Sequence, residues 1–197
     1  MRDFKLTETI CDQAVLVSAE LHGWSEWFTN ATAGPWKKID VPGVSSSYAT
    51  GFGKTEERPD LILYNDKPDK KILIIESKND IEKLLAPSQI PKSCKVFSDM
   101  KTKLDELCKS SKNKSISNNT KSINYIPGYV VGHTTDLIQK LPELEKLHFK
   151  HVDKSFPHFL LIVVIKSNYD LFIQPHIFSS KPNKKSLELQ KFFQTEI

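Results

Sequence analysis

The chain contains Arg58-Pro-Asp60-Leu-Ile-Leu-Tyr64 and, shortly afterwards, Lys71-Ile-Leu-Ile-Ile-Glu76-Ser-Lys78. Both stretches are short apolar runs of the length that is typical of buried strands. The polar residues 65–70, which include a proline, separate them and predict a turn. The sequence therefore predicts two adjacent strands with a hairpin-sized connection, and this pair decides the fold.

Charged residues stand at one end of this strand pair. Asp60 opens the first run, and Glu76 and Lys78 close the second. Side chains alternate along a strand, so Glu76 and Lys78 share a face with Ile72 and Ile74. Buried charges are costly unless they bind something. A metal ion held by Asp60 and Glu76, with Lys78 beside it, would offset that cost. The alternative is that Asp60 caps a strand while Glu76 and Lys78 form a surface ion pair.

The rest of the chain predicts further helices and strands. Apolar residues at helical spacing predict helices over 7–21, 88–107 and 134–147. Apolar runs predict strands over 125–131, 158–165 and 171–177, and polar composition predicts loops over 42–54 and 110–122. Thr7 and Gly23 should start and stop the first helix, Pro142 should break or kink the third, and a short helix should pass through Phe192 and Phe193. This order predicts an α/β fold with a mixed central β-sheet flanked by helices, in one domain spanning 1–197.

Composition narrows the class of protein. The 197 residues are 39% hydrophobic and 26% charged, which is ordinary for a soluble globular domain. The formal charge of +4 permits a polyanionic partner without requiring one. The three widely spaced cysteines predict reduced thiols in a cytoplasmic protein. The charged residues after Met1 do not resemble a signal peptide, and the longest apolar run, 159–165, is too short to span a membrane.

The charged residues of the strand pair also match a known signature. Pro59-Asp60, a spacer, and then Glu76-Ser77-Lys78 resemble the motif of the PD-(D/E)XK nuclease superfamily, the fold of many type II restriction endonucleases. The order of an N-terminal helix, the signature hairpin, a helix and another strand is similar too, over about the first two thirds of the chain. The resemblance implies a restriction-endonuclease-like core.

The resemblance also implies roles for these residues. The carboxylates of Asp60 and Glu76, with the backbone carbonyl of Ser77, would hold Mg²⁺, and Lys78 would be the catalytic lysine. Phosphodiester hydrolysis needs a water nucleophile and charge stabilisation at the scissile phosphate and the leaving alkoxide, which carboxylate-held Mg²⁺ and a nearby lysine supply.

Other residues are weaker candidates for the same site. Members of the superfamily often add an acidic residue from the N-terminal helix, for which Glu20 is our candidate and Glu8 its rival. Gln89 opens the helix after the signature, where some exonuclease-like relatives carry a functional glutamine. His148 and His151 have a metal-like spacing but lack a matching partner, so we interpret them as surface histidines.

The function that the resemblance implies is that of an Mg²⁺-dependent, sequence-specific endodeoxyribonuclease of the type II restriction class. Its substrate would be double-stranded DNA, with no membrane association. Cutting both strands of a palindromic site calls for a homodimer, and a small catalytic subunit working with a DNA-recognition subunit is a variant. The alternatives are a structure-specific DNA repair or recombination nuclease of the same fold, and a non-catalytic nucleic-acid-binding domain.

Overall fold

The two apolar runs form neighbouring strands of a six-stranded sheet. In the computed structural model, which describes residues 5–30, 37–44, 51–52, 57–67, 69–117, 123–167 and 170–180, β4 (Leu61–Asn65) pairs antiparallel with β5 (Lys71–Lys78). The strand order is β1-β4-β5-β6-β7-β8. The other strands of this sheet are β1 (Ser25–Thr29), β6 (Asn124–Gly132), β7 (His158–Ser167) and β8 (Asp170–Ser179).

The sheet is mixed, and its parallel part needs helical crossovers. Strands β5, β6 and β7 are parallel, whereas β1, β4 and β8 each run antiparallel to their neighbours. Parallel neighbours cannot be joined by a tight turn. Helix α3 (Gln89–Ser110) accordingly lies between β5 and β6 along the chain, and α5 (Leu137–His151) lies between β6 and β7.

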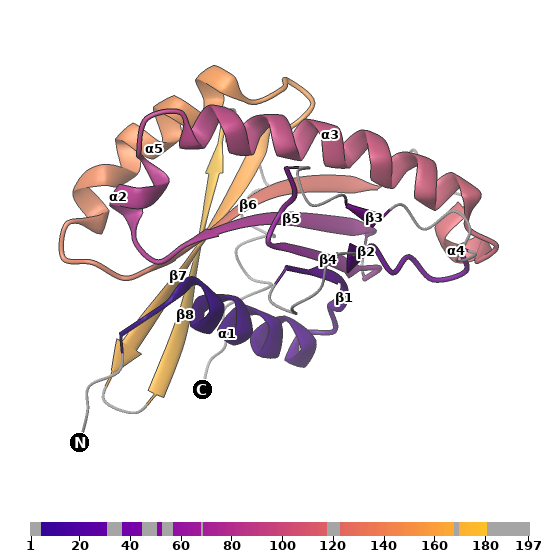
Figure 1. Ribbon diagram of the computed structural model, residues 1–197, viewed down its shortest axis with the longest axis horizontal. Helices are drawn as coiled ribbons and strands as arrows, with labels where there is room; N and C mark the ends of the chain where they lie inside the picture. The colour runs from indigo at the N-terminus through magenta and orange to yellow at the C-terminus, as the bar shows by residue number, and fades with distance from the viewer. Residues whose placement is uncertain are drawn as a thin grey trace.

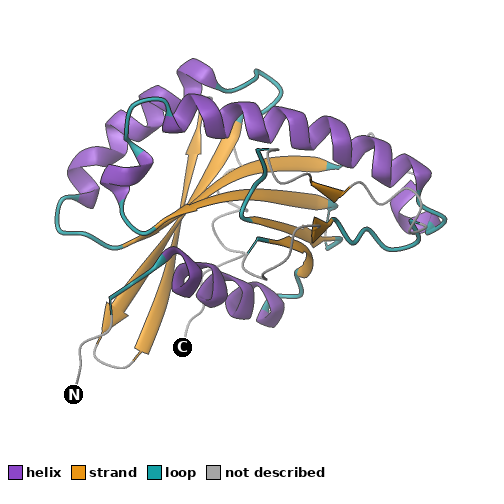
Figure 2. Ribbon diagram, viewed as in Figure 1, coloured by secondary structure: helices purple, strands orange, loops and turns teal. Residues whose placement is uncertain are grey.

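Helices cover both faces of the sheet (Figures 1 and 2). Helix α1 (Glu8–Leu21) lies on one face, and α2 (Ile81–Leu84), α3 and α5 lie on the other. The short helix α4 (Lys114–Ser117) follows α3, and β2 (Lys37–Lys38) pairs with β3 (Gly51–Phe52) in a separate two-stranded ribbon. The expected α/β fold with a mixed sheet flanked by helices is therefore confirmed.

The alternation of side chains along β5 divides the core into two layers. Ile72 and Ile74 belong to a buried cluster with Phe97 of α3, whereas Leu73 and Ile75 belong to a second cluster with α1. Because the period of a strand is two, each face of β5 meets a different helix layer. Glu76 therefore continues the α3 face of the strand, and the next residue returns to the α1 face.

The ends of α1 follow local rules of helix capping. The side chain of Thr7 accepts a hydrogen bond from the backbone N–H of Ile10 at 3.2 Å, as expected of an N-cap. Gly23 has a φ of +75°, a conformation that favours glycine and ends the helix. Both predictions for this helix are confirmed.

Several elements differ from the sequence prediction. β1, β2, β3 and α2 were not predicted, and β3 lies within the predicted loop 42–54. Helix α3 extends to Ser110, so that α4 occupies part of the predicted loop 110–122. Helix α5 is not broken at Pro142 but continues through it. Pro142 is the sixth residue of the helix, so its missing N–H leaves the carbonyl of Ile138 without the usual i→i−4 donor, a loss that the helix tolerates. Most of the loop 42–54 and the helix through Phe192 and Phe193 lie outside the described residues.

The remaining global features agree with an ordinary globular domain. Cys11, Cys94 and Cys108 are all buried and unpaired with one another, in agreement with the predicted reduced thiols. Within the described ranges, no helix has both the length and the apolar character needed to cross a membrane.

Candidate active site

The pairing of β4 with β5 places Asp60 beside the end of β5. The backbone N–H of Asp60 donates to the carbonyl of Ile75 at 2.8 Å, extending the antiparallel ladder by one residue. Its carboxylate accepts hydrogen bonds from the backbone N–H of Ser77 at 2.8 Å and from the side-chain amide of Asn30 at 3.3 Å. The Asp60 side chain is therefore held by backbone and side-chain donors at the position predicted for a metal ligand.

Glu76 and Lys78 form an ion pair on the same face of β5. The Lys78 ammonium lies 3.2 Å from Glu76 Oε1 and donates to the backbone carbonyl of Ser77 at 2.5 Å. The two side chains are only 12% and 17% exposed, so the pair is recessed and not a surface ion pair. The structure thus brings Asp60, Glu76, Ser77 and Lys78 together.

Burial and a neighbouring negative charge raise the pKa of the Glu76 carboxyl. Desolvation, reinforced by the charge of Asp60, raises the pKa of Glu76 to about 7, although Lys78 opposes the shift. For Lys78, burial favours the neutral amine, but the charges of Glu76 and Asp60 outweigh it, and the pKa is raised above its usual value. The lysine is therefore a cation at neutral pH and is able to stabilise negative charge.

Gln89 also reaches this cluster from the first turn of α3. Its amide nitrogen donates to Glu76 Oε1 at 3.3 Å and to the hydroxyl of Ser93 at 3.2 Å. The Ser93 hydroxyl in turn donates to the backbone carbonyl of Gln89 at 3.0 Å. Because Gln89 is bonded to both, it orients the same Glu76 oxygen that pairs with Lys78.

The acidic residue that α1 contributes is Asp12, which the sequence analysis did not single out. Asp12 is 5% exposed, and its carboxylate accepts a hydrogen bond from the hydroxyl of Ser77. Burial raises the pKa of Asp12 to about 7, and the negative charges of Asp60 and Glu8 add to this effect against the hydrogen bond from Ser77. Asp12 thus contacts β5 through Ser77, on the face of the strand opposite Glu76.

Of the two candidates from the sequence, Glu8 lies nearer to the site than Glu20. Glu8 precedes Asp12 by one helical turn and acts electrostatically on both Asp12 and Lys78. Glu20 is exposed and lies eight residues beyond Asp12, about 12 Å along the helix axis. The structure does not bring Glu20 to the cluster around Asp60.

A signal for Asp12 was present in the sequence. Asp12 lies at heptad-like spacing with Val15 and Ala19, and these three residues are buried together against the sheet. An acidic residue in a buried stripe is unusual and points to a function. The prediction of a helix over 7–21 did not place Asp12 on the buried side, and its last residue, Leu21, is 78% exposed.

The donor atoms of the cluster fit a hard divalent cation. Two carboxylates and one backbone carbonyl are oxygen ligands of the kind that Mg²⁺ prefers. Burial is the largest cause of the raised pKa of Glu76, and the nearby charge of Asp60 adds to it. In the part of the chain that the structure describes, no three His, Cys, Asp or Glu side chains gather closely enough to form a metal site by themselves. A cation here would therefore complete its coordination with water or substrate oxygens.

One histidine prediction is wrong. His151 is exposed as expected, but His148 is fully buried, and its Nδ1 lies 2.9 Å from the hydroxyl of Tyr129. The side of the α5 helix on which His148 lies faces the sheet, so its ring packs in the core, with its centroid 4.2 Å from that of Phe159. Neither histidine belongs to the cluster around Asp60.

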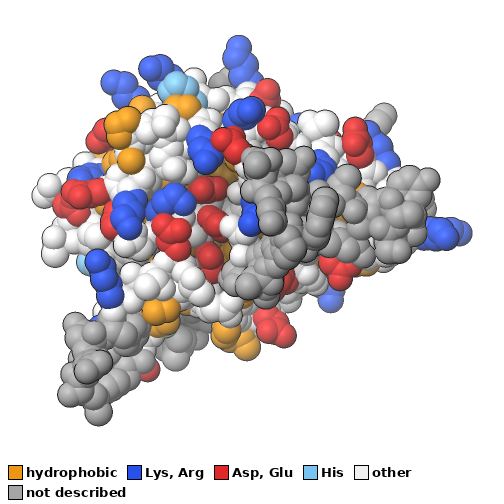
Figure 3. All heavy atoms as spheres, viewed as in Figure 1, with side chains coloured by type: hydrophobic (Ala, Val, Ile, Leu, Met, Phe, Trp, Pro, Cys, Tyr) orange, Lys and Arg blue, Asp and Glu red, His pale blue; other side chains and the backbone are white. Residues whose placement is uncertain are grey.

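The surface around the end of β5 carries charges of both signs. In Figure 3, acidic and basic side chains are interspersed between α1 and α3. A scan against protein-family models found no match to this sequence, and a search of curated proteins found none either. The functional interpretation therefore depends on the geometry of the site.

Proposed function

We propose that this chain is an Mg²⁺-dependent endodeoxyribonuclease with a restriction-endonuclease-like core. The observation that carries the proposal is the convergence of Asp60, Glu76 and Lys78 at the end of β5, with the Lys78 ammonium 3.2 Å from Glu76. The order of α1, the β4–β5 hairpin, α3 and the parallel strand β6 supports the same proposal, because it matches the order that the signature implies.

In this proposal each residue has a distinct task. Asp60 and Glu76, with the carbonyl of Ser77, hold the cation. Mg²⁺ held there would neutralise charge on the scissile phosphate and lower the pKa of a bound water. Lys78, kept protonated by its neighbours, orients the attacking water and stabilises the developing negative charge. Gln89 positions Glu76, and Asp12 supports β5 through Ser77.

The proposed substrate is double-stranded DNA, cut at a specific sequence in the cytoplasm. One chain supplies one cluster of these residues, so cutting both strands of a palindromic site would take a homodimer. Association with a DNA-recognition subunit would serve the same purpose.

The test is a digest of long, mixed-sequence DNA by purified protein with Mg²⁺, compared with Asp60→Asn. Discrete bands from the parent, absent with the variant, would support a sequence-specific endonuclease. Asp69→Asn is the matched control, because Asp69 is exposed in the turn at the other end of the hairpin and should leave cutting unchanged.

Other digest patterns would point elsewhere. A smear or degradation from ends would favour a structure-specific repair nuclease. Normal turnover by Asp60→Asn would refute the assignment of the site. Absence of cutting, together with Ca²⁺-dependent DNA binding by the parent, would favour a binding domain or a missing recognition subunit.

A further inference from the structure

A second lysine lies at the edge of the cluster around Asp60, on helix α3. Lys92 follows Gln89 by three residues, so the two side chains leave the helix on the same side. Gln89 bonds Glu76 Oε1 at 3.3 Å, which puts Lys92 near the same carboxylate. Burial is the main cause of the raised pKa of Glu76, and the positive charge of Lys92 is among the effects that lower this pKa. Lys92 is therefore close enough to the cluster to act on it.

Lys92 differs from Lys78 in its exposure. The side chain of Lys78 is 17% exposed, and its ammonium bonds both Glu76 and the backbone carbonyl of Ser77. The side chain of Lys92 is 53% exposed. Lys92 can therefore meet an anion that approaches from solvent, whereas Lys78 is held inside the cluster.

Lys92 pairs with the carboxylate of Glu57, on the segment that leads into β4. The Lys92 ammonium lies 3.7 Å from Glu57 Oε1, and the Glu57 side chain is 43% exposed. Charge-assisted hydrogen bonds between such groups are about 2.7–2.9 Å long, so this pair is loose. Exposed ion pairs contribute little to stability, because water and salt screen them. Another anion could therefore replace the Glu57 carboxylate at little cost.

The location of this ion pair indicates which anion that would be. Glu57 lies three residues before Asp60, and Lys92 acts on Glu76, so the pair adjoins both proposed metal ligands. Phosphates follow one another closely along a DNA strand. A strand with its scissile phosphate at the cation would therefore carry a neighbouring phosphate across the edge of the cluster. A lysine ammonium binds phosphate as a point charge, without the fixed geometry that arginine needs.

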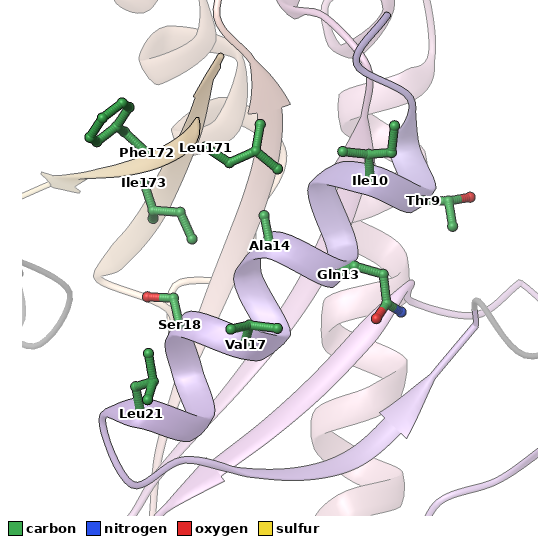
Figure 4. A pocket seen from close by; sticks show the side chains of 10 residues that line it. All are labelled: Thr9, Ile10, Gln13, Ala14, Val17, Ser18, Leu21, Leu171, Phe172 and Ile173. Atoms are coloured by element: carbon green, nitrogen blue, oxygen red, sulfur yellow. The ribbon is translucent and has the colours of Figure 1, made fainter. Parts of the chain in front are cut away.

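The apolar groove between α1 and β8 offers no such contact. It has a volume of about 700 Å³, and Figure 4 shows Leu171 and Ile173 of β8 across from Ala14 and Val17 of α1. None of the described residues that line this groove carries a charge. A phosphate would lose hydration there without gaining a cation. The charged edge of the cluster is therefore the better surface for a polyanion.

We propose that Lys92 binds a backbone phosphate of the DNA substrate next to the scissile one, and that Glu57 occupies this position in the absence of DNA. The inference rests on the proposed function, since it names a substrate contact of the same site. In the free protein, the Glu57 carboxylate keeps the Lys92 ammonium near the cluster. Binding of DNA exchanges one anionic partner of Lys92 for another, so Lys92 acts in binding and not in the chemical step.

Fluorescence anisotropy with a labelled, mixed-sequence duplex in Ca²⁺ tests the proposal. Lys92→Ala should lower the affinity about eightfold at about 0.1 M salt and make the slope of log K against log salt shallower by about 0.9, as expected for one lost phosphate contact. Glu57→Gln should raise the affinity about twofold or more, because it removes the competing carboxylate. Both side chains are exposed, so neither change should unfold the protein.

Matched controls and a double variant separate a specific contact from a general effect of charge. Lys146→Ala and Glu143→Gln make the same changes of net charge at exposed positions of α5 and should have much smaller effects. If Glu57 competes for Lys92, the gain from Glu57→Gln should disappear in Glu57→Gln with Lys92→Ala. A gain that persists in the double variant would overturn the proposal. So would an affinity and a salt slope that Lys92→Ala leaves unchanged.

Kinetics in Mg²⁺ check that Lys92 acts through binding. Lys92→Ala should raise KM for cleavage while kcat changes little. A large loss of kcat with KM unchanged would overturn the proposal, because it would assign Lys92 to the chemical step.

Failure of this inference can be told apart from failure of the proposed function. Cutting that Asp60→Asn abolishes, together with normal DNA binding by Lys92→Ala, would refute the phosphate contact and leave the function standing. A parent protein that neither binds nor cuts duplex DNA at low salt would refute both.

Discussion

At Glu76, burial of a negative charge lowers the stability of the folded protein, whereas the proposed metal site needs that charge. It is recessed, it faces the charge of Asp60, and its pKa is raised from 4.5 to about 7. A raised carboxyl pKa means that the folded state holds the proton more strongly than the unfolded state. The contribution of Glu76 to stability is therefore fully present below about pH 4.5 and is lost as the pH rises through about 7.

Replacing Glu76 with glutamine should therefore stabilise the protein without metal. At pH 8 in a chelator, we expect Glu76→Gln to raise Tm by a few degrees, because the buried negative charge is gone. Mg²⁺ should raise Tm of the parent but not of the variant. Thermal unfolding followed by circular dichroism measures both effects.

The matched control is Glu143→Gln, since Glu143 is exposed on α5. That change should leave Tm and its Mg²⁺ dependence as in the parent. An Mg²⁺-dependent rise of Tm that Glu76→Gln retains in full would contradict the role of Glu76 as a metal ligand.

Because His148 is buried, the free energy of unfolding should decrease at acid pH. Burial lowers the pKa of His148 from 6.5 to about 3. As the pH falls below about 6.5, the unfolded chain binds a proton that the folded chain refuses, so stability falls. At pH 5 the loss should amount to about 2 kcal/mol relative to neutral pH.

His148→Gln should reduce the acid dependence of the free energy of unfolding by this amount, even if the variant is less stable at every pH. Urea unfolding at pH 7.5 and pH 5 gives the comparison. His151→Gln, at an exposed position one turn further on, should retain the dependence of the parent. If the free energy of unfolding changed equally with pH in the parent and in His148→Gln, burial would not lower the pKa of His148 as expected.

At the scale of the element, α5 shows how one helix combines a buried and an exposed side. Leu144 and His148, one turn apart, are fully buried against the sheet, whereas Ile138 near the start is 77% exposed. The helix continues through Pro142, so these residues belong to one helix. The stability that α5 contributes should therefore come from its inner side.

Leu144→Ala should lower the free energy of unfolding by roughly 2–5 kcal/mol, because it removes buried methyl groups and leaves a cavity. Ile138→Ala should change it by less than about 0.5 kcal/mol. Urea denaturation of the two variants tests this difference. Equal effects would mean that the outer side of α5 is covered too.

At the scale of the whole molecule, charge should govern contact with a nucleic acid. The chain carries a formal charge of +4, and acidic and basic side chains are interspersed around the end of β5. In the complex with DNA that we propose, the acidic cluster would hold a cation, and lysines around it would contact the phosphates.

Binding of duplex DNA in Ca²⁺ should weaken steeply with salt. Each phosphate contact contributes about −0.9 to the slope of log K against log salt concentration, because bound counterions are released. Fluorescence anisotropy between low and moderate salt gives the slope. Lys78→Ala should bind with nearly the parent affinity, since the role proposed for Lys78 is in the chemical step. An affinity that does not change with salt would argue against a duplex ligand.

Much of the fold could be predicted because it depends on local patterns. The apolar runs before Glu76 and after Asp60 predicted β5 and β4, and the period of two predicted which residues of β5 share a face. Thr7 and Gly23 predicted the ends of α1 through capping chemistry alone. Such signals lie within a few residues of the element that they specify.

Other features depended on contacts between distant parts of the chain. β1 is a strand because its own Trp27 and Phe28 become buried and because β4 offers an edge for pairing, and that edge is not visible in the five residues of β1. α1 carries apolar residues on more than one side, and only docking on the sheet buries Val15 and leaves Leu21 exposed.

By itself, the sequence determined the α/β class, the signature hairpin and the grouping of Asp60, Glu76 and Lys78, because strand pairing and side-chain alternation follow from local chemistry. Only the tertiary structure decided that Asp12, rather than Glu20, reaches β5, and that Gln89 bonds Glu76. The rotation of α1 about its axis and the position of α3 on the sheet are set by packing across the core. Packing of that kind joins residues far apart in the chain and leaves no periodic signal along it.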